Sequence, residues 1–96
     1  MSEFQVVHED EAFIGHLEEV EGKIFFHVKV KDNLTRSDIR RGRELFEEIK
    51  QEVVAKGYNR LFAATPSPHF ARLLGPGFIH LETIHGLELI VWELKQ

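Results

Sequence analysis

The sequence predicts a mixed α/β domain of the α+β type, in which two helices pack on a mostly antiparallel sheet of five to six strands with the chain order β-β-β-α-β-α-β-β. Three observations predict this class. Apolar and polar residues alternate over 12–20 and 23–31, apolar residues recur at helical spacing over 36–56, and further extended runs occupy 59–65 and 77–94. A chain of 96 residues is expected to form one domain, 1–96.

The first half of the chain predicts three strands. Residues Phe4 to His8 read as a short strand, and segments 12–20 and 23–31 predict a hairpin that turns at Glu21-Gly22, where glycine supplies a positive φ. This register pairs Val20 with Lys23, Leu17 with Phe26, and His16 with His27.

Alternation assigns the hairpin side chains to two faces. The core face is expected to carry Leu17, Ile24, Phe26, Val28 and Val30. The opposite face, half polar and suited to a cleft or a partner surface, is expected to carry His16, Glu18, Phe25, His27 and Lys29.

The long helix is predicted over 36–56, with an apolar stripe at Ile39, Gly42, Leu45, Phe46, Ile49 and Val53. Thr35 and Asp38 have the spacing of a capping box, and Ser37 is the alternative cap. Gly57 is placed to end the helix in a left-handed conformation.

The second half continues with a strand at 59–65, whose apolar run 61–64 is typical of a central strand covered on both faces. Pro66 and Pro68 end this strand and begin a short helix over 68–74. A hairpin opened by Gly77-Phe78 then turns at His85-Gly86 and ends at Leu94. The strand-helix-strand stretch 23–65 predicts a right-handed parallel crossover.

Composition narrows the functional classes. The absence of cysteine excludes disulfides and thiolate chemistry, and a net charge of −4 argues against general nucleic-acid binding. The amino terminus does not resemble a secretory signal, and no segment has the roughly 20 apolar residues that a membrane span needs. A cytoplasmic location without membrane contact is therefore expected.

Four arginines crowd the start of the long helix, at positions 36, 40, 41 and 43. Backbone N–H groups and arginines at one helix start form a favourable phosphate site. The alternative is that Arg40 with Glu44 and Arg43 with Glu47 form surface pairs one helical turn apart.

The segment Ser37-Asp38-Ile39-Arg40-Arg41-Gly42, followed by Leu45-Phe46, resembles the Q/R-x-x-G-x-G/A signature of GNAT-family N-acetyltransferases. Gly42 matches the last signature position, whereas Arg40 replaces the first glycine and Ser37 the leading Gln or Arg. The resemblance implies acetyl-CoA as acyl donor, with cofactor contacts from Val28, Val30, Arg40, Arg41, Gly42 and Arg43.

The segment 70–78 is similar to the short helix and Gly-Phe that precede the closing hairpin of this family, so the resemblance covers about 12–94. Leu73 stands where many members have a tyrosine general acid, and the family's first strand and two early helices have no counterpart. Cut-down members occur in phages, which implies a host cytoplasm if the chain is phage-encoded.

Among six histidines, His27 is the candidate catalytic base, because an imidazole titrates near neutral pH and His27 would lie on the cleft-side face. His16, His27 and Glu18 together provide too few ligands to predict a metal site. The alternative is that both histidines are half-exposed sheet residues.

Two functions from different classes remain open. One is acyl-CoA binding with possible acyl transfer to an amine, and the other is a non-catalytic binding or assembly module that acts through protein contacts. The sheet face that bears Ile14 and Phe25 would lack a cover, which predicts a homodimer or another protein partner.

Overall fold

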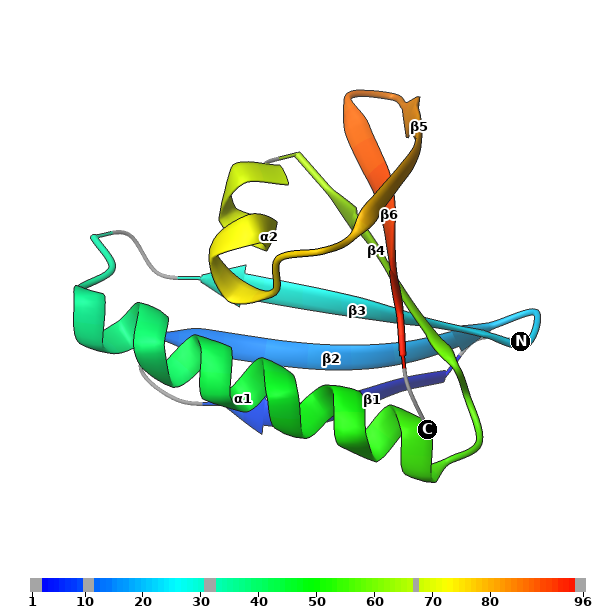
Figure 1. The fold of residues 1–96 in the computed structure, drawn as a ribbon, viewed down its shortest axis with the longest axis horizontal. Coiled ribbons are helices and arrows are strands. Elements are labelled where there is room, and N and C mark those ends of the chain that lie inside the picture. Colours follow the sequence, from blue (N-terminus) through cyan, green and yellow to red (C-terminus); the bar gives the residue numbers. More distant parts are fainter. Residues whose placement is uncertain (1–2, 10–11, 31–32, 67, 95–96) are drawn as a thin grey trace.

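The computed structural model describes residues 3–9, 12–30, 33–66 and 68–94 (Figure 1). Three strands, β1 (Glu3–Glu9), β2 (Phe13–Val20) and β3 (Lys23–Val30), precede the long helix α1 (Arg36–Ala55). Strand β4 (Arg60–Thr65), helix α2 (Pro68–Leu74) and the hairpin strands β5 (Ile79–Ile84) and β6 (Leu87–Glu93) follow.

All six strands join one sheet in the spatial order β1-β2-β3-β4-β6-β5. Neighbouring strands are antiparallel except β3 and β4, which run parallel and are connected through α1. The predicted α+β class, the mostly antiparallel sheet and the parallel crossover between the third and fourth strands are thus confirmed. The spatial order of the last two strands is the reverse of their order in the chain, because β6 lies beside β4 and β5 forms the outer edge.

The β2–β3 hairpin has the predicted register, in which Val20 pairs with Lys23, Leu17 with Phe26, and His16 with His27. Glu21 and Gly22 both have positive φ angles, 52° and 79°, as a two-residue turn of type I′ requires. The twist of this turn matches the twist of the flanking strands, so the turn and the alternating pattern select the same register.

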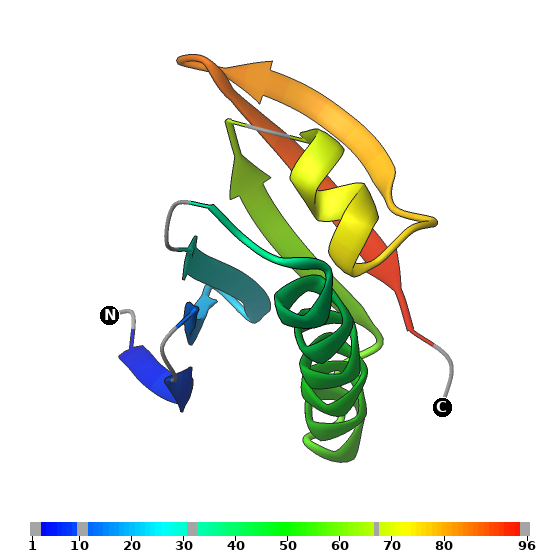
Figure 2. The same ribbon diagram turned by 90° about the vertical axis from the view of Figure 1, so that its left-hand side faces the viewer.

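Both helices cover the same face of the sheet. One core cluster joins Leu17 and Phe26 of the first hairpin to Phe46 of α1, Ala71 of α2 and Trp92 of β6. Figures 1 and 2 show α2 beside the first half of α1. The other face of the sheet has no helix within the described ranges 3–9, 12–30, 33–66 and 68–94.

Two burial expectations are wrong. Strand β4 is central but is covered on one face only, since Leu61 and Ala63 are buried whereas Ala64 is exposed. Val30, expected in the core, is 41% exposed because it is the last residue of β3, beyond the part of the strand that pairs with β4.

Helix α1 begins with the predicted capping box. The Asp38 N–H donates to Thr35 Oγ1 over 3.1 Å, and the Thr35 N–H donates to Asp38 Oδ2 over 3.0 Å. Ser37 therefore lies inside the first turn and is not the cap. At the other end Gly57 has a φ of 95°, and the Tyr58 N–H donates to the Val53 carbonyl, which closes the helix as predicted.

Thr35→Ala is expected to lower the free energy of unfolding by about 1 kcal/mol, because the Asp38 N–H loses its acceptor at the helix start. Urea denaturation of the variant and the parent protein measures this difference. Ser37→Ala is the matched control and should change stability by less than about 0.5 kcal/mol. Equal losses in the two variants would contradict Thr35 as the cap.

Candidate functional site

The arginine-rich segment lies in the first two turns of α1. The helix begins at Arg36, so the N–H groups of Arg40, Arg41 and Gly42 belong to the internal hydrogen-bond ladder. With the N–H groups of Thr35 and Asp38 used in the capping box, those of Arg36 and Ser37 have no hydrogen-bond acceptor among the described residues at this helix end. An anion here would meet mainly arginine side chains.

The arginine side chains have different partners. Arg41 Nη2 lies 3.1 Å from Asp38 Oδ1, in an ion pair within the first turn. The Arg43 Nε–H donates to the Leu73 carbonyl over 2.5 Å and so connects α1 to α2. Arg36 and Arg40 are exposed, and within the described part of the chain neither side chain forms an ion pair or hydrogen bond.

The alternative expectation of surface pairs one turn apart does not fit these contacts. Glu47 pairs with Lys50, at 2.6 Å between Oε1 and Nζ, whereas Arg43 reaches across to α2. Arg36 and Arg40 are the side chains in this cluster that are best placed to meet an external anion.

Gly42 has a packing role that its place in the sequence does not reveal. A Cβ atom at this position would lie 2.8 Å from Leu74 Cδ2 and 3.0 Å from Phe13 Cζ. Glycine therefore lets α1 approach both α2 and the start of β2. Close helix packing therefore accounts for a glycine at position 42 without a bound cofactor.

Strands β3 and β4 share a short parallel ladder, in which Phe25 pairs with Phe62. Beyond this pair the strands separate toward their carboxyl ends (Figure 1). A cavity of about 80 Å³ lies on the helix side of this gap, lined by Val28 of β3, Ala63 and Thr65 of β4, and Phe70 and Leu74 of α2. Of the residues predicted to bind cofactor, Val28 lines this cavity, and Val30 lies at the exposed end of the same strand.

His27 lies on the face of the sheet that points away from the helices, as alternation predicted. Its Nε2 is 2.9 Å from Glu18 Oε1, and the two residues are on adjacent strands. His16 pairs with His27 across the same two strands. The described residues contain no group of three or more side chains that could hold a metal ion. His27 does not line the β3–β4 cavity, so the candidate base and the candidate cofactor residue Val28 lie on opposite faces of β3.

Tyr58, the only tyrosine, follows α1 and donates its hydroxyl proton to Glu19 Oε2 of β2. This hydrogen bond, together with desolvation and the negative charge of Glu19, raises the pKa of Tyr58 above its ordinary value. The bond contributes to stability fully below the unfolded-state pKa of about 10, and this contribution is lost as the pH rises through the raised pKa.

Absorbance at 295 nm follows ionisation of this single tyrosine. We expect a midpoint above about 10 in the parent protein and a lower midpoint in Glu19→Gln, which removes the charged acceptor. Glu18→Gln is the matched control, because the Glu18 carboxylate forms its hydrogen bond with His27 on the other face of the sheet. An ordinary midpoint in the parent, or an equal change in both variants, would contradict the assignment.

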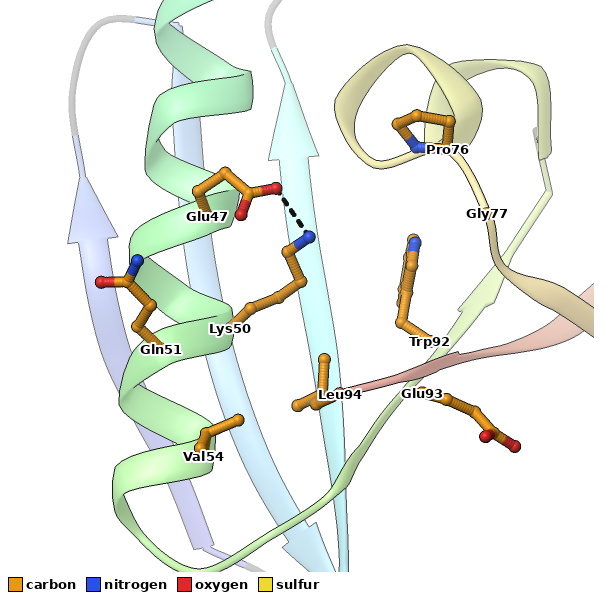
Figure 3. A pocket seen from close by; sticks show the side chains of 9 residues that line it. All are labelled: Glu47, Lys50, Gln51, Val54, Pro76, Gly77, Trp92, Glu93 and Leu94. Atoms are coloured by element: carbon orange, nitrogen blue, oxygen red, sulfur yellow. Dashed lines mark ion pairs between the residues drawn. The ribbon is translucent and has the colours of Figure 1, made fainter. Parts of the chain in front are cut away.

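A larger pocket of about 440 Å³ opens between α1 and the two ends of the last hairpin, residues 76–77 before β5 and residues 92–94 at the end of β6. Figure 3 shows Trp92, Pro76 and Leu94 on one side and the Glu47–Lys50 ion pair on the other. No motif in the sequence predicts this pocket, because its walls come from 47–54, 76–77 and 92–94 and meet only in the folded chain.

Comparisons with known proteins add no family assignment. No protein-family model matches the chain, and neither the curated proteins nor the solved structures include a match.

Across the described residues, neither helix has the length and apolar character to cross a membrane.

Proposed function

We propose that the chain binds acyl-CoA, with the extended pantetheine arm between the separating ends of β3 and β4 and the phosphates at the start of α1. The observation that carries this proposal is the gap beyond Phe25 and Phe62, which has a cavity on its helix side lined by Val28. The resemblance of 37–42 to the GNAT signature agrees with this location.

The chemistry of the gap suits an amide-containing chain. In a strand, alternate N–H and C=O groups point toward each neighbouring strand, so separation of β3 from β4 exposes backbone groups along both inner edges. The two amides of pantetheine are complementary to such edges. Apolar walls from Val28 and Phe70 suit the methylene segments between those amides.

Anion binding in this proposal depends on side chains more than on backbone. Arg36 and Arg40 are exposed cations beside the free N–H groups of Arg36 and Ser37. The carboxylate of Asp38, a residue that is only 7% exposed, opposes an anion, but its ion pair with Arg41 offsets much of that charge. Arg40, standing at a family glycine position, therefore takes the main phosphate-binding role.

The proposal concerns binding, and acyl transfer would be a further step. His27 faces away from the cavity that Val28 lines, so a base for transfer would have to act from the opposite side of the sheet. His27→Ala is accordingly a useful second variant, because acetyl-CoA affinity should remain unchanged in it even if a transfer assay loses activity.

Isothermal titration with acetyl-CoA tests the proposal. We expect saturable binding in the micromolar range, and Arg40→Glu should weaken it at least about tenfold, because a charge-assisted contact becomes a repulsion. Arg60→Glu is the control with the same charge change, since Arg60 is exposed at the opposite end of β4 and lies 3.9 Å from Glu93. An absence of both heat and thermal shift at about 1 mM acetyl-CoA would overturn the proposal.

A non-catalytic assembly module is the second candidate, and specific contacts favour it. Gly42 is explained by its contact with Leu74 and Phe13, and the Arg43 side chain is engaged by the Leu73 carbonyl. These contacts would be retained in a scaffold that has lost the cofactor. The same titration separates the two candidates, because an assembly module predicts no binding and no effect of Arg40→Glu.

A further inference from the structure

The last hairpin concentrates exposed apolar surface. Four of the five large hydrophobic residues that are strongly exposed in the described chain belong to it: Ile79 at 50%, Leu81 at 48%, Ile84 at 46% and Leu87 at 41%. Every residue of β5 is exposed. A cluster of this kind is typical of an interaction surface.

Strand β5 is also an edge of the sheet. It pairs with β6 on one side, and its outer side faces no other strand of the described sheet. The six residues of β5 include no proline, lysine or arginine, which are the residues that commonly block pairing at exposed edges. Its outer backbone groups are therefore open to pairing with another strand.

A bulge in β5 determines which side chains share a face. Ile79 pairs with Val91 and Ile84 with Leu87, whereas the register shifts between His80 and Glu82. Residues five apart in a regular strand point to opposite faces, but this shift puts Ile79 and Ile84 on the same face. His80 and Thr83, which pair with Ile90 and Glu88, share the other face.

From this pattern we propose that β5 pairs antiparallel with β5 of a second copy of the chain, about a twofold axis between Leu81 and Glu82. In this register Ile79 lies opposite the partner's Ile84, and His80 lies opposite the partner's Thr83. Each pair joins side chains of the same face. The twofold axis repeats both pairs, so the apolar surfaces of the two hairpins become continuous.

The neighbouring symmetric registers fit less well. An axis at Glu82 would bring two carboxylates directly opposite each other, which is destabilising. An axis at Leu81 would place His80 opposite the partner's Glu82, although the bulge directs these side chains to different faces. The axis between Leu81 and Glu82 also puts Leu81 opposite the partner's Glu82, and it is the one that matches the faces of the two flanking pairs without opposing like charges.

The expected association is weak. One pair of six-residue strands covers less surface than the about 800 Å² per partner of a standard protein interface. Association should therefore depend on concentration, and sedimentation velocity over about 1 µM to about 1 mM covers the relevant range. The surface is separate from the β3–β4 gap, so the inference does not depend on acyl-CoA binding.

Directed cross-linking tests the register, because the chain has no native cysteine. Ile79→Cys and Ile84→Cys are made as separate variants at exposed positions, and far-ultraviolet circular dichroism checks their fold. An equimolar mixture should form a disulfide-linked heterodimer under mild oxidation, since opposed residues in antiparallel strands have Cα separations of about 4.5–5.5 Å. Each variant alone should not cross-link appreciably, because its two cysteines would be about 17 Å apart along the strands.

Leu87→Cys provides the matched control. Leu87 is similarly exposed but lies on β6, one strand further from the axis, so a mixture with Ile79→Cys should not cross-link. A constant monomer mass up to about 1 mM would overturn the proposal. Equal cross-linking of Ile79→Cys alone and of the mixture with Ile84→Cys would also overturn it.

Discussion

Phe46→Ala is expected to lower the free energy of unfolding by about 3–5 kcal/mol, the largest loss expected from the variants considered. Phe46 is 1% exposed, and its ring centroid lies 4.7 Å from that of Trp92 and 5.8 Å from that of Phe26. Truncation removes the aromatic contacts that Phe46 of α1 makes with both halves of the sheet. Domains of this size have a total stability of about 5–15 kcal/mol, so this variant would be close to unfolding.

Urea denaturation followed by Trp92 fluorescence measures this loss. Leu45→Ala is the neighbouring control, because Leu45 is half-buried at the margin of the same core and should cost less. If the variant does not fold at all, Phe46→Leu gives a graded measurement with a smaller expected loss. Equal losses for Phe46→Ala and Leu45→Ala would contradict the central position of Phe46.

Gly75→Ala is expected to cost about 2–3 kcal/mol through overpacking. A Cβ atom at this position would lie 2.1 Å from Phe46 Cε2 and 2.6 Å from Phe46 Cδ2. The Gly75 carbonyl also accepts the indole N–H of Trp92 over 2.6 Å, so displacement of this backbone would strain a buried hydrogen bond. Thermal or urea unfolding gives the magnitude.

A double variant distinguishes this cause from a general effect of losing glycine. Phe46→Leu removes the ring that the new methyl group would meet, so Gly75→Ala should cost less in that background than in the parent protein. Gly57→Ala is the comparison for backbone effects alone, because Gly57 has a φ of 95° and a Cβ atom there would have no neighbour within 4 Å. Additive losses in the double variant would contradict direct contact between positions 75 and 46.

Local rules predicted much of this fold. The alternation and the Glu21-Gly22 turn predicted the β2–β3 register, and the Thr35–Asp38 spacing predicted the capping box. Gly57 likewise ends α1 as expected. These features depend on residues close together in sequence, so the pattern in one short segment determines them.

Features that depend on long-range packing were not predictable in the same way. The glycines at 42 and 75 owe their identity to Leu74, Phe13 and Phe46, which the folded chain brings against them. The bulge in β5 is equally hidden, because the sequence of the hairpin is compatible with regular pairing over its whole length. The exposure of Ala64 depends on there being no helix over that face in the described chain.

For the candidate site, the sequence placed residues on the correct elements but did not reveal their interactions. Alternation separated His27 from Val28, and the structure puts them on opposite faces of β3. The family resemblance implied cofactor contacts from residues 40–43, yet the cap at Thr35 places their backbone N–H groups inside the helix. A signature aligned on Leu45-Phe46 does not reveal where the helix begins, and that position decides which amides are free.

Backbone amide shifts of ¹⁵N-labelled protein during titration with acetyl-CoA test the proposed function most directly. We predict shift changes grouped at Val28, Val30, Ala64 and the start of α1 from Arg36 to Arg40, with the His85-Gly86 turn unchanged. Shift changes confined to Lys50, Gln51 and Leu94 would place the ligand in the larger pocket instead. That outcome, or an unchanged spectrum at about 1 mM acetyl-CoA, would contradict binding between β3 and β4.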